Sequence, residues 1–185
     1  MKSWALRISF LVLFLLILLL FLYFILFKPG NENLYSEQVS SGKLKNPVAN
    51  VEDSEALRNF DDTYVHYLLY LIKAYNLHNP PLSNEDPLLE VILDDSTYHS
   101  YIKKGIIQVF EGGATNEDII VYSTKSEVIK MLRDSNYIIQ SFDSGNSKIE
   151  LKAGSGALFS KGYLNLYNEL TGDGITGGVV AISSP

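Results

Sequence analysis

The feature that most constrains this chain is an unbroken apolar run near its N-terminus. Residues 8–27 read ISFLVLFLLILLLFLYFILF, and only Ser9 and Tyr23 carry polar side-chain atoms. Twenty residues of helix measure about 30 Å, which is the thickness of the hydrocarbon core of a bilayer. A backbone in lipid must also satisfy its own hydrogen bonds, which a helix does. The run therefore predicts one transmembrane helix, within a membrane anchor that covers residues 1–28.

A cleaved signal peptide is the alternative explanation of this run. Such a peptide has an apolar region of about 7–15 residues followed by small residues at the cleavage site. Here the apolar run is longer, and residues 27–30 read FKPG, which are bulky or charged. An uncleaved signal-anchor is favoured. Because Lys2 and Arg7 precede the run, the sequence predicts a single-pass protein of the cell membrane, with a cytoplasmic N-terminus and an extracytoplasmic domain.

The charge of the remaining chain argues against binding to nucleic acid. The anchor holds Lys2, Arg7 and Lys28 and no acidic residue, so 12 of the 15 basic residues and all 21 acidic residues lie in residues 29–185. Contact with phosphates needs clustered Lys and Arg, which an acidic domain does not supply. The chain has no cysteine, which excludes disulfides, cysteine metal ligands and cysteine nucleophiles.

Behind the anchor, the composition divides the chain into a flexible linker, one domain and a Gly-rich tail. The linker is predicted at residues 29–53, the domain at 54–171 and the tail at 172–185. Apolar residues recur every three or four positions between residues 54 and 77, which predicts a long helix. Further helices are predicted from a capping box at 124–127 and at about 156–170, and extended segments at 88–93, 97–103, 106–110, 118–122, 137–142 and 147–152.

The turns between the extended segments decide the expected architecture. Short strands joined by tight turns indicate antiparallel hairpins, because parallel strands need long crossovers. The predicted fold class is therefore α+β, with an antiparallel five-stranded sheet and helices packed on one face.

The polar residues form no pattern that is typical of catalysis or metal binding. Asp94, Asp95 and His99 are close in sequence, but they lack a known metal-ligand spacing. Glu90 and Asp118 could share acid and base roles if they were close together, and the sequence cannot place them so. We expect no metal site, no cofactor and no enzymatic activity.

The order of short motifs from residue 97 to residue 172 resembles the sterol carrier protein type of lipid-binding domain. Residues 104–109 (KGIIQV) resemble the glycine turn and short strand of that family, and residues 117–122 (EDIIVY) resemble its acidic residue and next strand. Residues 126–132 resemble its short helix, and residues 144–151 (SGNSKIEL) resemble its following strand. The resemblance covers roughly 75 of the 185 residues.

This resemblance implies a tunnel for a fatty acyl chain or another lipid between the sheet and the helices. Six residues match positions expected near such a tunnel, although each would also serve as ordinary core: Val128, Leu132, Phe142, Phe159, Tyr163 and Tyr167. The expected function is a membrane-anchored, non-catalytic module that binds a lipid or another apolar ligand. The alternative is a membrane-tethered structural or protein-interaction domain whose core is filled by its own side chains. A continuous cavity would separate the two.

Overall fold

The structure, a computed structural model, describes residues 2–26, 38, 44–80 and 83–171, with the side chains of the first helix described from Phe10 to Tyr23. The predicted tail and much of the predicted linker lie outside these residues. The helices are α1 (Lys2–Leu26), α3 (Asp53–Arg58), α4 (Asp62–Leu71), the 3-10 helix η1 (Ala74–Asn76), α5 (Lys125–Arg133), α6 (Tyr137–Asp143), α7 (Ser155–Ser160) and α8 (Tyr163–Thr171). The strands are β1 (Leu88–Leu93), β2 (Ser96–Lys103), β3 (Ile106–Glu111), β4 (Ile119–Ser123) and β5 (Lys148–Leu151).

The five strands form one mixed sheet in the order β3-β2-β1-β4-β5. Strands β1, β2 and β3 are antiparallel neighbours, as their tight turns predict, and β4 pairs antiparallel with β5. However, β4 lies parallel to β1, with Val91 opposite Val121. The α+β class and five strands are confirmed, but the prediction of an antiparallel sheet is wrong. The reason is the segment 112–118, which returns the chain to the start of β1, where the Asp118 amide donates to the Leu88 carbonyl.

The second correction concerns the predicted transmembrane helix. Within the residues that the structure describes, no helix is both long enough and apolar enough to span a membrane. The described side chains of α1, Phe10 to Tyr23, are all exposed.

Three other predicted segments differ from the structure. The helix predicted over 54–77 is divided into α3, α4 and η1, because the Asp61 side chain caps a new helix by accepting from the Thr63 amide at 3.0 Å. The helix predicted at 156–170 is divided at Gly162, whose φ of +87° cannot continue a helix. Residues 137–142 were expected to be extended, and they form α6 instead.

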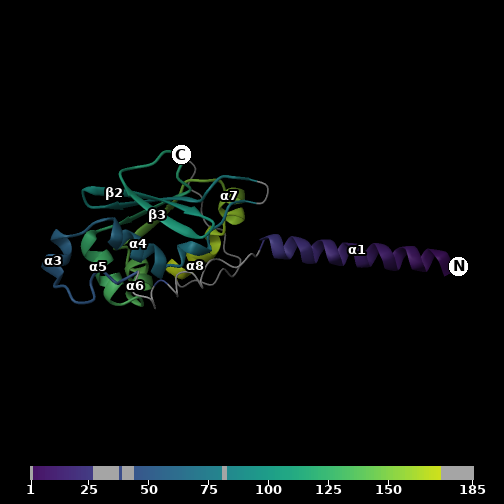
Figure 1. Ribbon diagram of the computed structural model, residues 1–185, viewed down its shortest axis with the longest axis horizontal. Coiled ribbons are helices and arrows are strands. Elements are labelled where there is room, and N and C mark those ends of the chain that lie inside the picture. The colour runs from purple at the N-terminus through teal and green to yellow at the C-terminus, as the bar shows by residue number, and fades with distance from the viewer. Residues whose placement is uncertain (1, 27–37, 39–43, 81–82, 172–185) are drawn as a thin grey trace.

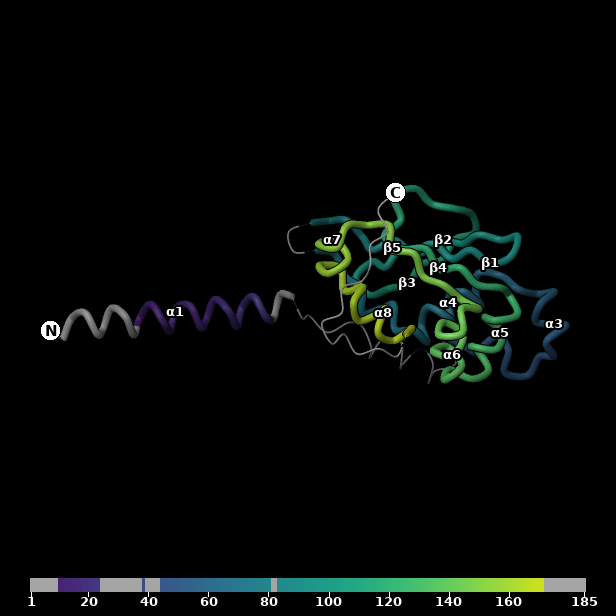
Figure 2. Tube along the Cα trace, turned by 180° about the vertical axis from the view of Figure 1, so that it is seen from behind, coloured from purple at the N-terminus to yellow at the C-terminus, as the bar shows by residue number. Residues whose placement is uncertain are grey.

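The core lies between the sheet and the helical layer. Figures 1 and 2 show α4, α5, α6 and α8 together on one side of the strands. Alternate residues of β1 point to this layer, and Leu89, Val91 and Leu93 are fully buried there. Burying one such side chain stabilises the fold by about 1.5–3 kcal/mol.

Residues 46–51, within the predicted linker, pack against α5. Val48 is buried in the core, and the Asn46 side chain donates to the Leu132 carbonyl at 2.7 Å. The Arg133 guanidinium donates to the carbonyls of Val48 and Val51. These contacts hold the segment before α3 against the helical layer.

Candidate functional site

A small cavity lies between the sheet and the helical layer. Side chains from six elements line it, and the surface they expose to it is apolar: Leu68, Leu69, Ile72, Val91, Val121, Ser123, Met131, Phe142 and Leu170. The empty space around it amounts to about 290 Å³, part of which is open to solvent. The cavity itself has room for about one water molecule. Like the tunnel that the resemblance implies, it lies between the sheet and the helices, but it is much smaller than an acyl chain needs.

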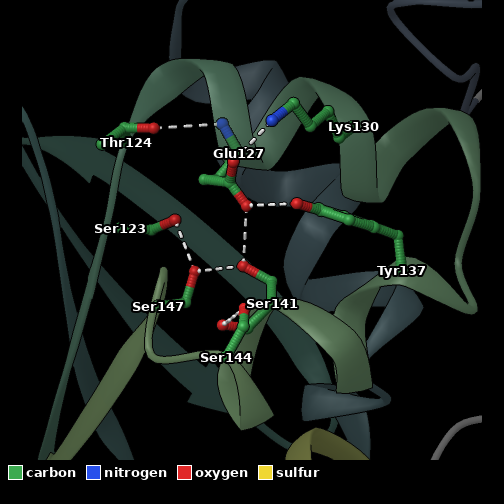
Figure 3. Close-up of polar contacts among 8 residues, drawn as sticks. All are labelled: Ser123, Thr124, Glu127, Lys130, Tyr137, Ser141, Ser144 and Ser147. Carbon is green, nitrogen blue, oxygen red and sulfur yellow. Dashed lines mark hydrogen bonds and ion pairs between the residues drawn. The ribbon is translucent and has the colours of Figure 1, made fainter.

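The polar residues beside this cavity are centred on Glu127 of α5. The Thr124 hydroxyl accepts from the Glu127 amide at 3.1 Å, so the predicted start of this helix is confirmed. The Glu127 carboxylate points away from the cap, as Figure 3 shows. Its Oε2 accepts from the hydroxyls of Tyr137 and Ser141, each at 2.9 Å, and its Oε1 accepts from Lys130 at 2.7 Å. The carboxylate therefore ties α5 to α6.

A chain of serine hydroxyls continues from Glu127 to the cavity wall. The Oγ atoms of Ser141 and Ser147 are 2.9 Å apart, and those of Ser147 and Ser123 are 2.8 Å apart (Figure 3). An ionised carboxylate only accepts hydrogen bonds, so Ser141 must donate to it and can in turn accept from Ser147. The network connects α5, α6, β4 and the start of β5.

The same contacts decide the ionisation of Glu127. Burial favours the neutral acid, but the hydrogen bonds from Lys130, Ser141 and Tyr137 outweigh it, and the pKa of Glu127 is lowered. The group is therefore ionised at neutral pH. A charged acceptor strengthens the hydrogen bonds that hold α6.

Phe142 links this polar network to the cavity. It follows Ser141 on α6, is half-buried, and forms part of the cavity wall. Since Ser141 is fixed by Glu127, the network also fixes the position of Phe142.

A second buried polar cluster joins the α7–α8 junction to the start of β4. The Lys161 ammonium lies 2.8 and 3.0 Å from the two carboxylate oxygens of Asp118, and the Tyr163 hydroxyl donates to Asp118 at 2.9 Å. The Leu88 amide also donates to this carboxylate, at 2.8 Å. Burial, and then the nearby Asp118 charge, raise the pKa of Tyr163 well above its ordinary value. Asp118, which directly precedes β4, thus joins the start of β1 to the α7–α8 junction and to α8.

Glu90 and His99 are register partners on the sheet face that points away from the helical layer, and they hold the segment 112–118. The Glu90 carboxylate accepts from the Ala114 amide at 2.7 Å, and His99 Nδ1 lies 2.9 Å from the Gly112 carbonyl. Glu90 and Asp118 therefore serve separate contacts. Among the residues that the structure describes, no three His, Asp or Glu side chains are grouped so that they could hold a metal ion.

The structure places one of the six predicted ligand residues, Phe142, in the cavity wall. Val128 and Leu132 are buried on α5 outside the cavity lining, Tyr163 is buried against Asp118, and Tyr167 is half-buried on α8. Phe159 points to solvent, with an exposed fraction of 59%. Sequence reasoning missed Ser123 and Val121, although both follow the alternation that turns Ile119 toward the helices. Whether any of the six binds a ligand stays a prediction.

No family model matches the chain, and no curated protein matches it either. Solved structures to which it is similar include two sterol carrier protein 2 structures. One is the ubiquinone synthesis protein UbiJ-SCP2 (16% identity, TM-score 0.33, 62% of this chain and 96% of that chain). The other is Sterol Carrier Protein 2 Like 2 from Aedes aegypti (12% identity, TM-score 0.34, 59% of this chain and 94% of that chain).

The chain is also similar to part of the sec-alkylsulfatase Pisa1 from Pseudomonas sp., at 13% identity and a TM-score of 0.35. That match covers 53% of this chain, which spans only 15% of the sulfatase. Sterol carrier protein 2 structures are thus among those to which the chain is similar. Each TM-score is below 0.5, so these likenesses carry no argument about ligand or activity.

Proposed function

We propose that the domain is a non-catalytic module that binds a lipid or another apolar ligand between its sheet and its helices. The observation that supports this proposal best is the apolar cavity beneath Phe142. Apolar ligands are held by dry apolar surface with few polar groups, and each buried methylene contributes about 0.8 kcal/mol. Such binding needs no reactive side chain.

The size of the cavity adds a condition to this proposal. Sites for small ligands usually measure roughly 300–1,000 Å³, whereas this cavity has room for about one water molecule. An acyl chain must therefore displace part of the wall. The half-buried Phe142 is a wall residue that can move outward, because it already reaches the surface.

We also propose that the chain works at a membrane, with its domain on the extracytoplasmic side. The described side chains of α1 leave an uninterrupted apolar surface, with exposed fractions from 42% for Leu22 to 73% for Phe10. Apolar surface of this extent is rare in soluble proteins and attracts lipid or protein. The chain should be recovered with the membrane fraction, and protease added to intact cells or spheroplasts should cleave the domain. Recovery in the soluble fraction, or full protection of the domain, would contradict this part.

The alternative function is a protein-interaction domain with a filled core. The observation in its favour is an aromatic cluster on the sheet face opposite the helices, where His99 stacks on Phe110 at a centroid distance of 5.5 Å and Tyr101 lies beside both. Phe110 has an exposed fraction of 48%. Aromatic side chains are enriched at protein interfaces.

Native mass spectrometry of the full chain distinguishes the two functions. The chain would be purified and exchanged from detergent into an amphipathic polymer, which shields α1 without adding free detergent. A co-purifying lipid, released on denaturation, supports the ligand-binding function. A bare mass, together with no uptake of added hexadecanol or palmitate, contradicts it. A defined protein complex that is lost in Phe110→Ala would then support the alternative.

A further inference from the structure

We propose that α6 and its flanking turns, residues 134–146, are a lid over the cavity, and that Glu127 is the latch that holds the lid closed. This inference rests on the proposed ligand-binding function and adds a control point to it. The segment is called the lid below. Three observations support it: the contact of the lid with the cavity, the few buried groups that hold it, and the geometry of its ends.

The lid contributes one wall residue, Phe142, to the cavity. The remaining wall comes from β1, β4 and the helices α4, α5 and α8. Displacing these elements would break the sheet or the centre of the core, because Leu69, Val91 and Met131 are fully buried. Displacing the lid is the smallest change that enlarges the cavity.

Few groups hold the lid in place. Only Ile138 and Ser141 of α6 are buried, and Tyr137 and Phe142 are half-buried. Segments with few buried apolar contacts open at a lower free energy than the rest of a fold. The principal polar attachments of its side chains are the two hydroxyls on Glu127 and the Ser141–Ser147 contact.

Both ends of the lid are turns. At one end the Asp134 carboxylate accepts from the Asn136 amide at 3.0 Å, which forms a local turn before α6. At the other end Gly145 has a φ of +76°, and a Cβ placed there would have nothing within 4 Å. A glycine in open space can change its dihedral angles without a steric clash. These turns can serve as the two pivots of the lid.

The latch lies at one point, on the side of the lid that faces α5. Opening the lid must separate Tyr137 and Ser141 from the Glu127 carboxylate. Hydrogen bonds to a charged acceptor are about twice as strong as those between neutral groups. The charge of Glu127 therefore sets the rate at which the lid opens, and hence the rate at which a ligand enters.

The substitution Glu127→Gln tests the latch, because it removes the charge and keeps the shape. Glu150→Gln is a matched control: Glu150 also accepts from a tyrosine, Tyr122 at 2.8 Å, and from a lysine, Lys152 at 3.3 Å, but it lies on β5. We expect Glu127→Gln to raise two rates about tenfold: amide exchange in α6, and uptake of the fluorescent fatty acid cis-parinaric acid in stopped flow. Glu150→Gln should leave both rates unchanged.

A reversible disulfide gives a second test that leaves Glu127 itself unchanged. The Oγ atoms of Ser141 and Ser147 are 2.9 Å apart, so Ser141→Cys with Ser147→Cys brings two thiols together in a chain that has no other cysteine. The oxidised protein should take up cis-parinaric acid more slowly than the wild type. The reduced protein has lost the Ser141 latch and should take it up faster.

The outcomes distinguish a failure of the lid proposal from a failure of the ligand-binding function on which it rests. If the wild type binds the probe, and neither Glu127→Gln nor oxidation of the cysteine pair changes the uptake rate, the lid is overturned and ligand binding stands. If the wild type binds neither cis-parinaric acid nor hexadecanol, the proposed function is overturned, and the lid with it.

Discussion

Ser141 and Phe142 are consecutive residues of α6 whose side chains serve different parts of the site. Ser141 donates to the buried Glu127 carboxylate at 2.9 Å, while Phe142 covers the apolar cavity between the sheet and the helices. The polar contact of Ser141 thereby fixes the neighbouring part of the cavity wall. This coupling makes the stability of the Glu127 network relevant to ligand entry.

The contribution of Glu127 to stability should depend on pH. Its folded pKa is lowered from the ordinary value of 4.5, so its stabilising effect is fully present above pH 4.5 and is lost as the pH falls through the lower, folded value. Glu127→Gln should lower the unfolding free energy by about 1–2 kcal/mol at neutral pH, since hydrogen bonds to a charged group are lost. Part of the interaction is with the exposed Lys130 and is screened by solvent.

Urea unfolding of the wild type and Glu127→Gln at several pH values checks this prediction. The difference between the two proteins should shrink below pH 4.5 and be absent well below the folded pKa. A difference that stays constant down to about pH 2 would show that the carboxylate does not stabilise the fold through its charge.

The buried ion pair of Asp118 and Lys161 should matter far more than an exposed one. Asp118→Asn leaves a buried ammonium without its counter-charge, which costs about 3–5 kcal/mol. The matched control is Asp95→Asn, because Asp95 also pairs with a lysine, Lys125, at 3.0 Å while its side chain is 85% exposed. Thermal unfolding should show a large loss for the first variant and almost none for the second. Equal effects would contradict the burial argument.

Gly162, at the α7–α8 junction, and Gly156, within α7, should respond to alanine in opposite directions. Gly162 has a φ of +87°, which an L-residue adopts only with strain, so Gly162→Ala should destabilise the fold by about 1–2 kcal/mol. Gly156 lies within α7, and a Cβ there meets nothing within 4 Å. Gly156→Ala should therefore stabilise the fold by about 0.5–1 kcal/mol. Urea unfolding measures both changes, and a shift of the same sign in both would contradict the backbone argument.

The local features of the fold could be predicted where neighbouring residues decide them. The turn between β2 and β3 and the Thr124 cap of α5 are set by residues a few positions apart, and both predictions are confirmed. The parallel pairing of β1 with β4 depends on Asp118, Glu90 and His99, which hold the returning segment from distant positions. These contacts leave no periodic pattern in the sequence, so the parallel pairing could not be predicted from it.

The segment 137–142 shows the same limit at the candidate site. Its residues YIIQSF are typical of a strand, because β-branched and aromatic side chains favour extended backbone. In the structure, Ser141 and Tyr137 reach Glu127 only when the segment is helical, and Ile138 is buried in the same conformation. Tertiary contacts therefore override the local preference, and the sequence alone could not show that Phe142 and Glu127 belong to one site.

The most direct test of the ligand-binding claim is a titration of the full chain with cis-parinaric acid, in the wild type and in Val91→Ile with Val121→Ile. These two valines are register partners on β1 and β4 and both line the cavity, so the variant adds two methylenes to it. The matched control is Val48→Ile with Val65→Ile, at buried positions that do not line the cavity. Binding in the cavity predicts about tenfold weaker affinity for the first variant, at about 0.8 kcal/mol per displaced methylene, and unchanged affinity for the control. Equal affinity in all three proteins would show that the ligand binds elsewhere.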